Sequence, residues 1–120
     1  MKQLLEGARA VVKQYMNSEV EFYNEDGSVH LKSKCRYQPI NRGTSRETSQ
    51  SVYFYRDVRI QLPYEADTRG LFPNMKYQIV ESQNDQLVGR EGTVRWAQDS
   101  DMAIERTVLA VEDMGDMGGY

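Results

Sequence analysis

The sequence is poor in the residues that crosslink small proteins. Cys35 is the only cysteine and His30 the only histidine among 120 residues. One cysteine excludes a disulfide within the chain, and a structural zinc site wants about four Cys or His ligands. A chain this short has little interior and often needs a disulfide, a metal or a partner. We therefore expect no metal and no cofactor, and we expect partner subunits to supply the extra burial.

Long apolar runs are lacking as well. The longest are four residues, at 52–55 and 108–111, whereas a membrane-spanning helix needs about 20. Glu6, Arg9 and Lys13 interrupt any apolar segment near the N-terminus, so we expect no signal peptide. These features predict a protein that is made and kept in a cytosol-like compartment and contacts no membrane.

Most of the chain has no excess charge of either sign. The sequence holds 15 Lys and Arg against 18 Asp and Glu, a net charge of −3. Glu112, Asp113 and Asp116 account for the whole excess, so residues 1–111 are neutral. A neutral body argues against a general nucleic-acid binder, because phosphate neutralisation supplies most of such a protein's affinity. We predict one domain over 1–112 and a flexible acidic tail over 113–120, ordered only against a neighbouring subunit.

Residues 2–16 have the period of an amphipathic helix. Their apolar side chains recur along one stripe, with polar residues on the other side; the stripe is Leu4, Leu5, Ala8, Val11, Val12, Tyr15 and Met16. Everything after residue 18 has the shorter period of strands, so the fold class is mainly β. We predict a small β-barrel or sandwich with one N-terminal α-helix over about 2–16 and a long polar loop.

The best-defined strand signal spans residues 29–37, where apolar and polar side chains alternate after a turn at Asn24–Gly27. If Phe22 pairs with Val29, then Glu21 lies opposite His30 and Glu19 opposite Lys32, which would support the pairing by charge. Further strands are expected at 52–62, 75–81, in a short run to residue 88, and at 93–96 and 104–111. Residues 41–51 contain no apolar side chain and are predicted to form a polar, functional or mobile loop.

Catalytic groups are not paired in this sequence. Cys35 and His30 are five residues apart, and an odd spacing on a strand places side chains on opposite faces. We interpret Cys35 as a core thiol and His30 as a surface imidazole beside Glu21. No catalytic residue is assigned and no enzyme activity is expected.

Basic residues gather between residues 31 and 60, which carry a local charge of +5. This strip is either a solvated strand face or one side of a contact between different patches of two subunits, and arginine is favoured in such contacts. The acidic tail, or the Glu19 and Glu21 edge of a neighbouring copy, would supply the other side. The candidate interface residues are Lys32, Lys34, Arg36, Tyr53, Tyr55, Arg56, Glu112, Asp113 and Asp116.

Several segments carry a resemblance to a known family. They are Cys35-Arg36-Tyr37-Gln38-Pro39 before the polar loop, Arg59-Ile60-Gln61-Leu62-Pro63-Tyr64 after it, Thr93-Val94-Arg95-Trp96-Ala97, and Glu105-Arg106 in the last strand. Over roughly residues 4–112 the chain resembles the small head-to-tail connector proteins, also called stopper or head-completion proteins, of long-tailed bacteriophages. Its second linker, 64–74, lacks the Gly-Asp turn of that pattern, so the strand order after residue 63 stays open.

The resemblance implies a β-barrel assembled as a homo-oligomeric ring of six or twelve copies. The ring would lie in the neck of the virion, assembled in the bacterial host cytoplasm, with a portal or adaptor protein above and a tail-terminator or tail-tube protein below. Double-stranded DNA would pass through its channel without sequence preference. The matching channel loop, which would gate DNA exit, contains Arg42, Gly43, Thr44, Ser45, Arg46 and Glu47.

Two other classes of function remain open from the residues. The first alternative is a small oligonucleotide- or ligand-binding barrel that uses Tyr53, Tyr55 and the basic strip as a stacking platform. Its neutral body and an isoelectric point near 5.2 count against it. The second is a hydrolytic enzyme, which lacks any pair of catalytic groups.

Overall fold

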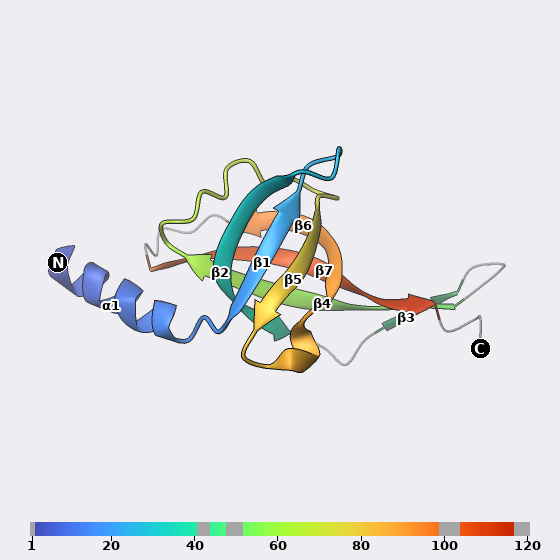
Figure 1. The fold of residues 1–120 in the computed structure, drawn as a ribbon, viewed down its shortest axis with the longest axis horizontal. Coiled ribbons are helices and arrows are strands. Elements are labelled where there is room, and N and C mark those ends of the chain that lie inside the picture. Colours follow the sequence, from blue (N-terminus) through green and yellow to red (C-terminus); the bar gives the residue numbers. More distant parts are fainter. Residues whose placement is uncertain (1, 41–43, 48–51, 99–103, 117–120) are drawn as a thin grey trace.

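The structure is a computed structural model that describes residues 2–40, 44–47, 52–98 and 104–116. These residues form one helix, seven strands and a short 3₁₀ helix (Figure 1). In chain order these are α1 (Lys2–Gln14), β1 (Ser18–Tyr23), β2 (Val29–Pro39), β3 (Thr44–Glu47), β4 (Val52–Pro63), β5 (Lys76–Ser82), η1 (Asp85–Leu87), β6 (Glu91–Gln98) and β7 (Glu105–Asp116).

Six strands form a closed antiparallel barrel. Their order is β2, β1, β5, β6, β7 and β4, and a pairing of β2 with β4 closes the barrel. Strand β3 pairs with the first part of β4 and lies outside this closed set. The structure confirms the predicted mainly β fold with an N-terminal helix, and it forms the barrel rather than the sandwich.

Alternate residues of each strand fill the barrel interior, as a period of two predicts. On β2, Cys35 and Tyr37 are buried while the residues between and beside them are exposed. The predicted core thiol at Cys35 is therefore confirmed. The buried core consists of Val20, Phe22, Cys35, Tyr37, Val58, Ile60, Leu62, Leu71, Met75, Tyr77, Ile79, Val94, Val108 and Ala110.

The register of the first hairpin differs from the predicted one. Glu21 lies opposite Lys32 and Tyr23 opposite Val29, and a bulge between these two pairs takes up His30. The expected pairing of Glu21 with His30 is therefore wrong. Alternation fixes which face a side chain occupies, but it does not reveal a bulge that inserts one residue and shifts the partner strand.

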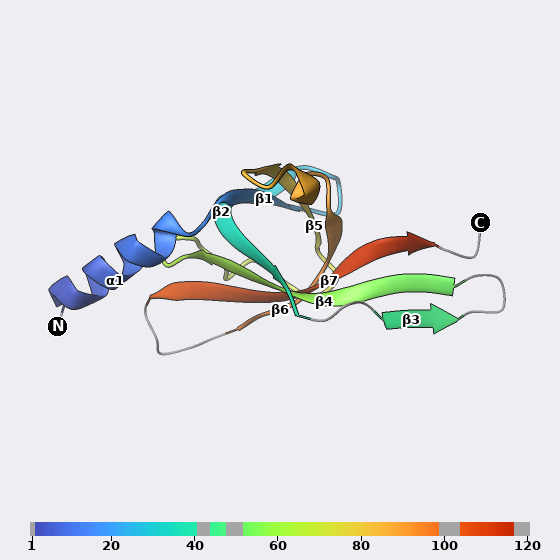
Figure 2. The same cartoon turned by 90° about the horizontal axis from the view of Figure 1, so that it is seen from below.

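Helix α1 projects from one end of the barrel instead of lying across it (Figures 1 and 2). The ring of Tyr64, just after β4, contacts one guanidinium group from the helix and one from the barrel. The Cζ atom of Arg9 on α1 lies 3.7 Å from the Tyr64 ring centroid, and that of Arg106 on β7 lies 4.3 Å from it. Within the described ranges, no helix has the length and apolar character needed to cross a bilayer.

Two segments of the second half differ from their predicted structure. The run before Val88 forms the 3₁₀ helix η1, which the Asn84 side chain caps by accepting from the Gln86 N–H. Strand β7 continues past residue 111 to Asp116, which lies opposite Tyr53 of β4. Residues 113–116 thus belong to the sheet, and the expected flexible tail from residue 113 is wrong at these positions; residues 117–120 lie outside the described chain.

Candidate functional site

A three-stranded extension beyond the barrel contains four residues of the predicted channel loop, Thr44–Glu47 (Figure 2). It is built from β3, the first part of β4 and the end of β7. Thr44, Ser45, Arg46 and Glu47 form β3, so a loop without regular structure was the wrong expectation at these four positions. These residues are all polar, so no alternation of apolar side chains indicated a strand. Their backbone groups nevertheless pair with β4. Arg42 and Gly43 lie outside the described residues.

The basic strip on β2 is exposed, but its lysines lie beside acids of the same chain. Lys32 Nζ is 3.6 Å from Glu19 Oε2 and 3.9 Å from Glu21 Oε2. Lys34 lies directly opposite Glu19 on β1, and Arg36 is exposed further along β2. The acidic edge that was expected to meet the strip of a neighbouring copy therefore already faces the strip of its own copy. Exposed pairs of this kind contribute little to stability.

Glu112 is buried in the barrel rather than exposed at its surface. Its side chain is 2% exposed, and Arg56 Nε donates to its Oε2 atom. Arg90 Nη1 lies 3.4 Å from its Oε1 atom. Two predicted interface residues, Arg56 and Glu112, thus contact each other within one copy, and the interface assignment of Glu112 is wrong. A buried carboxylate needs such partners, because an unpaired charge in the interior is very costly.

Two buried tyrosines lie next to this ion pair. The hydroxyl oxygens of Tyr37 and Tyr77 are 2.7 Å apart. Burial raises the pKa of both phenols, and the charge of Glu112 raises each pKa further. Gly92 makes room for the group, because a Cβ atom there would lie 2.9 Å from the Tyr77 hydroxyl oxygen. Sequence reasoning missed this cluster, although Glu112 has the same strand parity as the buried Ala110.

Cys35 and His30, the nucleophile and base considered above, lie in different environments, one in the core and one at the surface. Cys35 is completely buried, and burial raises the pKa of its thiol to about 12. His30 is exposed, as predicted, and its ring lies against Gly70 of the linker after β4 rather than beside Glu21. Within the described ranges, no group of three His, Cys, Asp or Glu side chains has the proximity to hold a metal ion.

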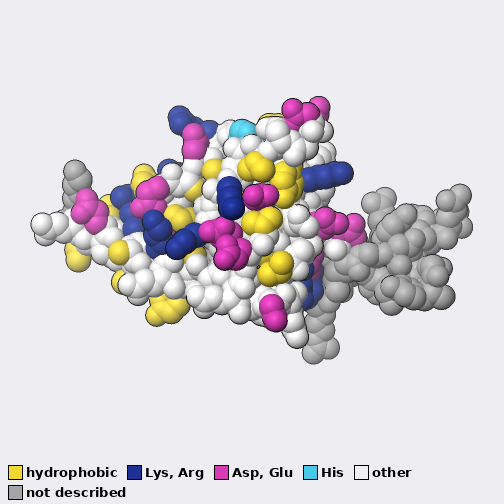
Figure 3. All heavy atoms as spheres, viewed as in Figure 1, with side chains coloured by type: hydrophobic (Ala, Val, Ile, Leu, Met, Phe, Trp, Pro, Cys, Tyr) yellow, Lys and Arg dark blue, Asp and Glu magenta, His cyan; other side chains and the backbone are white. Residues whose placement is uncertain are grey.

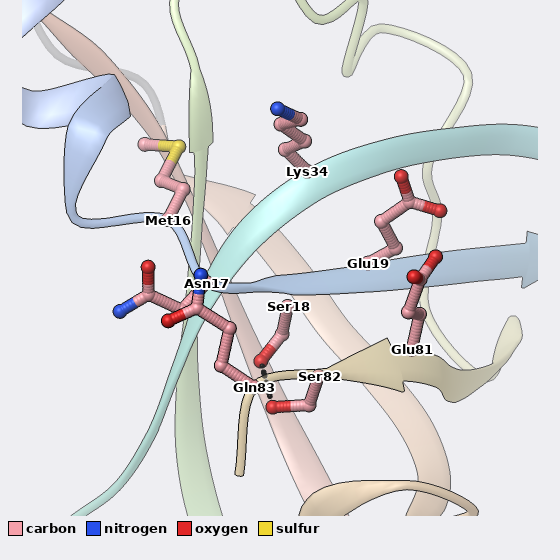
Figure 4. A pocket seen from close by; sticks show the side chains of 8 residues that line it. All are labelled: Met16, Asn17, Ser18, Glu19, Lys34, Glu81, Ser82 and Gln83. Atoms are coloured by element: carbon pink, nitrogen blue, oxygen red, sulfur yellow. Dashed lines mark hydrogen bonds between the residues drawn. The ribbon is translucent and has the colours of Figure 1, made fainter. Parts of the chain in front are cut away.

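A hollow of about 300 Å³ marks the junction between α1 and the barrel (Figure 4). Ser18 and Ser82 share a hydrogen bond of 2.8 Å across β1 and β5. The carboxylates of Glu19 and Glu81 come from neighbouring strands, and Lys34 lies on the adjacent strand β2. The Ser18–Ser82 hydrogen bond and the backbone hydrogen bond from the Gln83 N–H to the Asn17 carbonyl both connect the start of β1 to the end of β5. We therefore interpret the residues around this hollow as structural.

A more apolar groove follows the far end of β1. Two adjoining hollows, of about 510 and 440 Å³, share Tyr23 and Lys76, and we call them together the Tyr23 groove. Phe72, 52% exposed, lines the first hollow, and Tyr55 lines the second. The remaining lining residues are Asn24, Glu25, Gly27, Pro73, Asn74, Met75, Tyr77, Glu91, Gly92, Thr93, Val111 and Asp113.

The lining of the Tyr23 groove is negatively charged. Glu25, Glu91 and Asp113 line it against the single base Lys76, a formal charge of −2. Tyr55 and Asp113 were both expected in a subunit interface, and the structure brings them together here. An acidic lining repels a phosphate backbone, which disfavours Tyr55 as a stacking platform for nucleic acid. Of the other predicted interface residues, Tyr53 and Asp116 lie opposite each other in the extension.

Comparison with known proteins identifies one family. A family model described as a family of unknown function, DUF6093, matches residues 8–111, which is most of the chain. No curated protein and no solved structure matches the chain. The matched range includes strands β1 to β6, the second half of α1, and β7 as far as Val111.

Proposed function

The chain belongs to the DUF6093 family, and we propose that it is a structural virion protein that forms a homo-oligomeric ring in the head–tail connector of a long-tailed bacteriophage. The ring joins the DNA-filled head to the tail in the neck of the virion. A portal or adaptor protein contacts it from above, and a tail-terminator or tail-tube protein contacts it from below. The resemblance of residues 4–112 to small connector proteins is the basis of this proposal.

The observation that carries the proposal is the position of the β3–β4 hairpin. The hairpin and the end of β7 extend beyond the closed barrel at the end opposite α1 (Figures 1 and 2). A segment that reaches out of a rigid barrel is suited to project into a central channel when copies surround an axis. Residues 44–47 form β3 in this extension, and the proposed gate that retains DNA is the segment 42–47 to which they belong.

The charge of the hairpin suits a channel through which DNA must pass. Arg42 and Arg46 stand against Glu47, a formal charge of +1 for residues 42–47. A strongly basic lining would hold phosphates by many contacts, and the affinity would fall steeply with salt. A weakly charged lining touches DNA without trapping it, so the gate works by closing the channel rather than by binding.

Deletion of residues 43–49 tests the gate. We expect the variant to form rings of the wild-type mass and to bind filled heads, but to let DNA leak, measured as nuclease-sensitive DNA. Replacement of the same residues by glycine and serine at equal length is the matched control, because it restores the reach of the segment. Normal DNA retention by the deletion variant would refute the gate.

Binding to heads tests the connector itself. The purified chain is mixed with DNA-filled heads that lack tails, and complexes are imaged by negative stain. We expect a ring-shaped density at the portal vertex and recovery of tail attachment. A chain that never binds heads, but binds single-stranded oligonucleotides with a steep salt dependence, would refute the connector and favour the oligonucleotide-binding barrel.

A further inference from the structure

We propose that the exposed stripe of α1 in one copy docks into the Tyr23 groove of the next copy. This inference deepens the proposed ring, since it names the two surfaces that join its subunits. It starts from the helix, whose apolar stripe is only partly covered by its own barrel. Leu5, Ala8 and Val12 are half-buried, whereas Leu4 is 73%, Val11 53% and Tyr15 65% exposed.

Two of the exposed apolar side chains lie on one face of the helix. Positions 4 and 11 are separated by seven residues, so a period of 3.6 brings them to the same face, and Tyr15 follows directly after the end of α1. Hydrophobic side chains are visible on this projecting helix at the left of Figure 3. A continuous apolar face of this kind marks a contact site when it stands free of the body of the protein, and helix-in-groove docking uses this spacing.

The Tyr23 groove has the complementary shape and charge. It is hollow and lined by aromatic side chains, among them Tyr23, Tyr55 and the half-exposed Phe72. Its lining carries a formal charge of −2, whereas α1 carries three bases and one acid, a formal charge of +2. Opposite charge around an apolar contact directs the approach and fixes the orientation of the two partners.

The helix cannot reach the groove of its own copy. It joins the barrel at the start of β1, whereas Tyr23, shared by both hollows, is the last residue of β1. The strand Ser18–Tyr23 separates these points by about 17 Å at 3.4 Å per residue, and α1 points away from the barrel (Figure 1). The occupant of the groove is therefore the helix of a second copy.

The two surfaces differ, so the contact is head-to-tail. A head-to-tail contact leaves one free helix and one free groove on every growing assembly, and it closes only as a ring. This is the interface type that a ring of identical subunits requires.

Two single substitutions test the contact from its two sides. Val11→Asp places a negative charge on the helix stripe against the acidic groove, and Phe72→Asp disrupts the groove. Ala10→Asp, exposed on another face of α1, and Val88→Asp, 47% exposed and not among the groove's lining residues, are the matched controls. We expect light scattering after gel filtration to give one-copy masses for the first pair and the wild-type multi-copy mass for the controls. Circular dichroism confirms that each variant is folded.

Mixing the two disrupted variants gives the sharper result. Val11→Asp retains its groove and Phe72→Asp retains its helix, so an equimolar mixture has one intact contact and should form two-copy complexes that grow no further. A mixture that stays at one copy, disrupted variants that keep the wild-type mass, or a wild-type chain that stays monomeric at every concentration would overturn the inference. If wild-type copies assemble through this contact but never bind filled heads, only the connector function fails. If Val11→Asp assembles and binds heads normally, only the contact fails.

Discussion

The hydroxyl groups of Tyr37 and Tyr77 form a hydrogen bond of 2.7 Å in the interior of the barrel. The two residues lie on β2 and β5, which flank β1 on either side, and both side chains are buried. The bond therefore connects two strands that share no backbone pairing with each other. Each hydroxyl satisfies the other where water has no access, so the pair stabilises the barrel only while both members are present.

Removal of one of the two hydroxyl groups should destabilise the fold, because the other hydroxyl then stays buried without this partner. Tyr37→Phe leaves the Tyr77 hydroxyl without this partner, and we expect a loss of about 1–3 kcal/mol in the free energy of unfolding. Tyr37→Phe with Tyr77→Phe should cost less than the sum of the single changes. Urea unfolding followed by circular dichroism at one protein concentration measures both. Additive losses would contradict the coupling.

Gly92 and Gly7 should respond in opposite directions to the same substitution. A Cβ atom at Gly92 would collide with the Val111 carbonyl oxygen of β7 and lie 2.9 Å from Glu112 Cα, whereas one at Gly7 meets nothing within 4 Å. We expect Gly92→Ala to destabilise by several kcal/mol, because backbone cannot move aside in a closed barrel. Gly7→Ala should stabilise α1 by up to about 1 kcal/mol. Thermal unfolding of both variants is the measurement, and a tolerated Gly92→Ala would refute the close approach.

The patterns in the sequence were sufficient to predict helices and strands, but not to predict which side chains contact each other across the barrel. Alternation located the buried face of β2, and a period of 3.6 located α1. The same alternation runs through Val108, Ala110 and Glu112, yet the charge of Glu112 led to its assignment to a subunit interface. Its partner Arg56 lies 56 residues away in the chain, and only the closed barrel brings them together.

Some features gave no signal in the sequence. Strand β3 contains no apolar residue, so the sequence showed no alternation of apolar and polar side chains there. The strand forms through backbone pairing with β4. The bulge at His30 shifts the register without changing the face of the residues after it. The Tyr23 groove combines residues from five strands and two connections, a combination that depends on the strand order after residue 63, which the sequence left open.

Alkaline pH should destabilise the fold. The Cys35 thiol has an ordinary pKa of 9.0, and burial raises it to about 12 in the folded chain. From about pH 9 the unfolded chain loses this proton and the folded chain keeps it, so stability falls with rising pH by at most about 1.4 kcal/mol per unit. The raised pKa values of Tyr37 and Tyr77 add to the loss above their ordinary value of 10.0.

The Cys35→Ala variant separates the thiol from the phenols. Urea unfolding between pH 8 and pH 10 should show a shallower fall for Cys35→Ala than for the wild type, whatever the stability of the variant at pH 8. The comparison uses the slope, so a small cavity at position 35 does not affect it. Equal slopes in the two proteins would contradict the raised pKa of the buried thiol.

The contact between the Arg9 guanidinium and the Tyr64 ring should restrict the orientation of α1 relative to the barrel. The Cζ atom of Arg9 on α1 lies 3.7 Å from the centroid of the Tyr64 ring, while Arg106 on β7 donates to the Tyr64 carbonyl at 3.0 Å. Cation–π contacts contribute about 0.5–2 kcal/mol, so Arg9→Ala should speed amide hydrogen exchange in α1 about two- to thirtyfold. Lys13→Ala, exposed on the same helix, is the matched control.

The consequence for assembly follows from the geometry of a projecting helix. A helix that pivots freely presents its apolar face over many directions, and each docking event must then fix that freedom at an entropic cost. We therefore expect Arg9→Ala to weaken assembly more than Lys13→Ala, which removes the same charge from α1, as a higher concentration for the midpoint between one-copy and multi-copy masses. Equal exchange rates and equal midpoints in Arg9→Ala and Lys13→Ala would show that Tyr64 does not orient the helix.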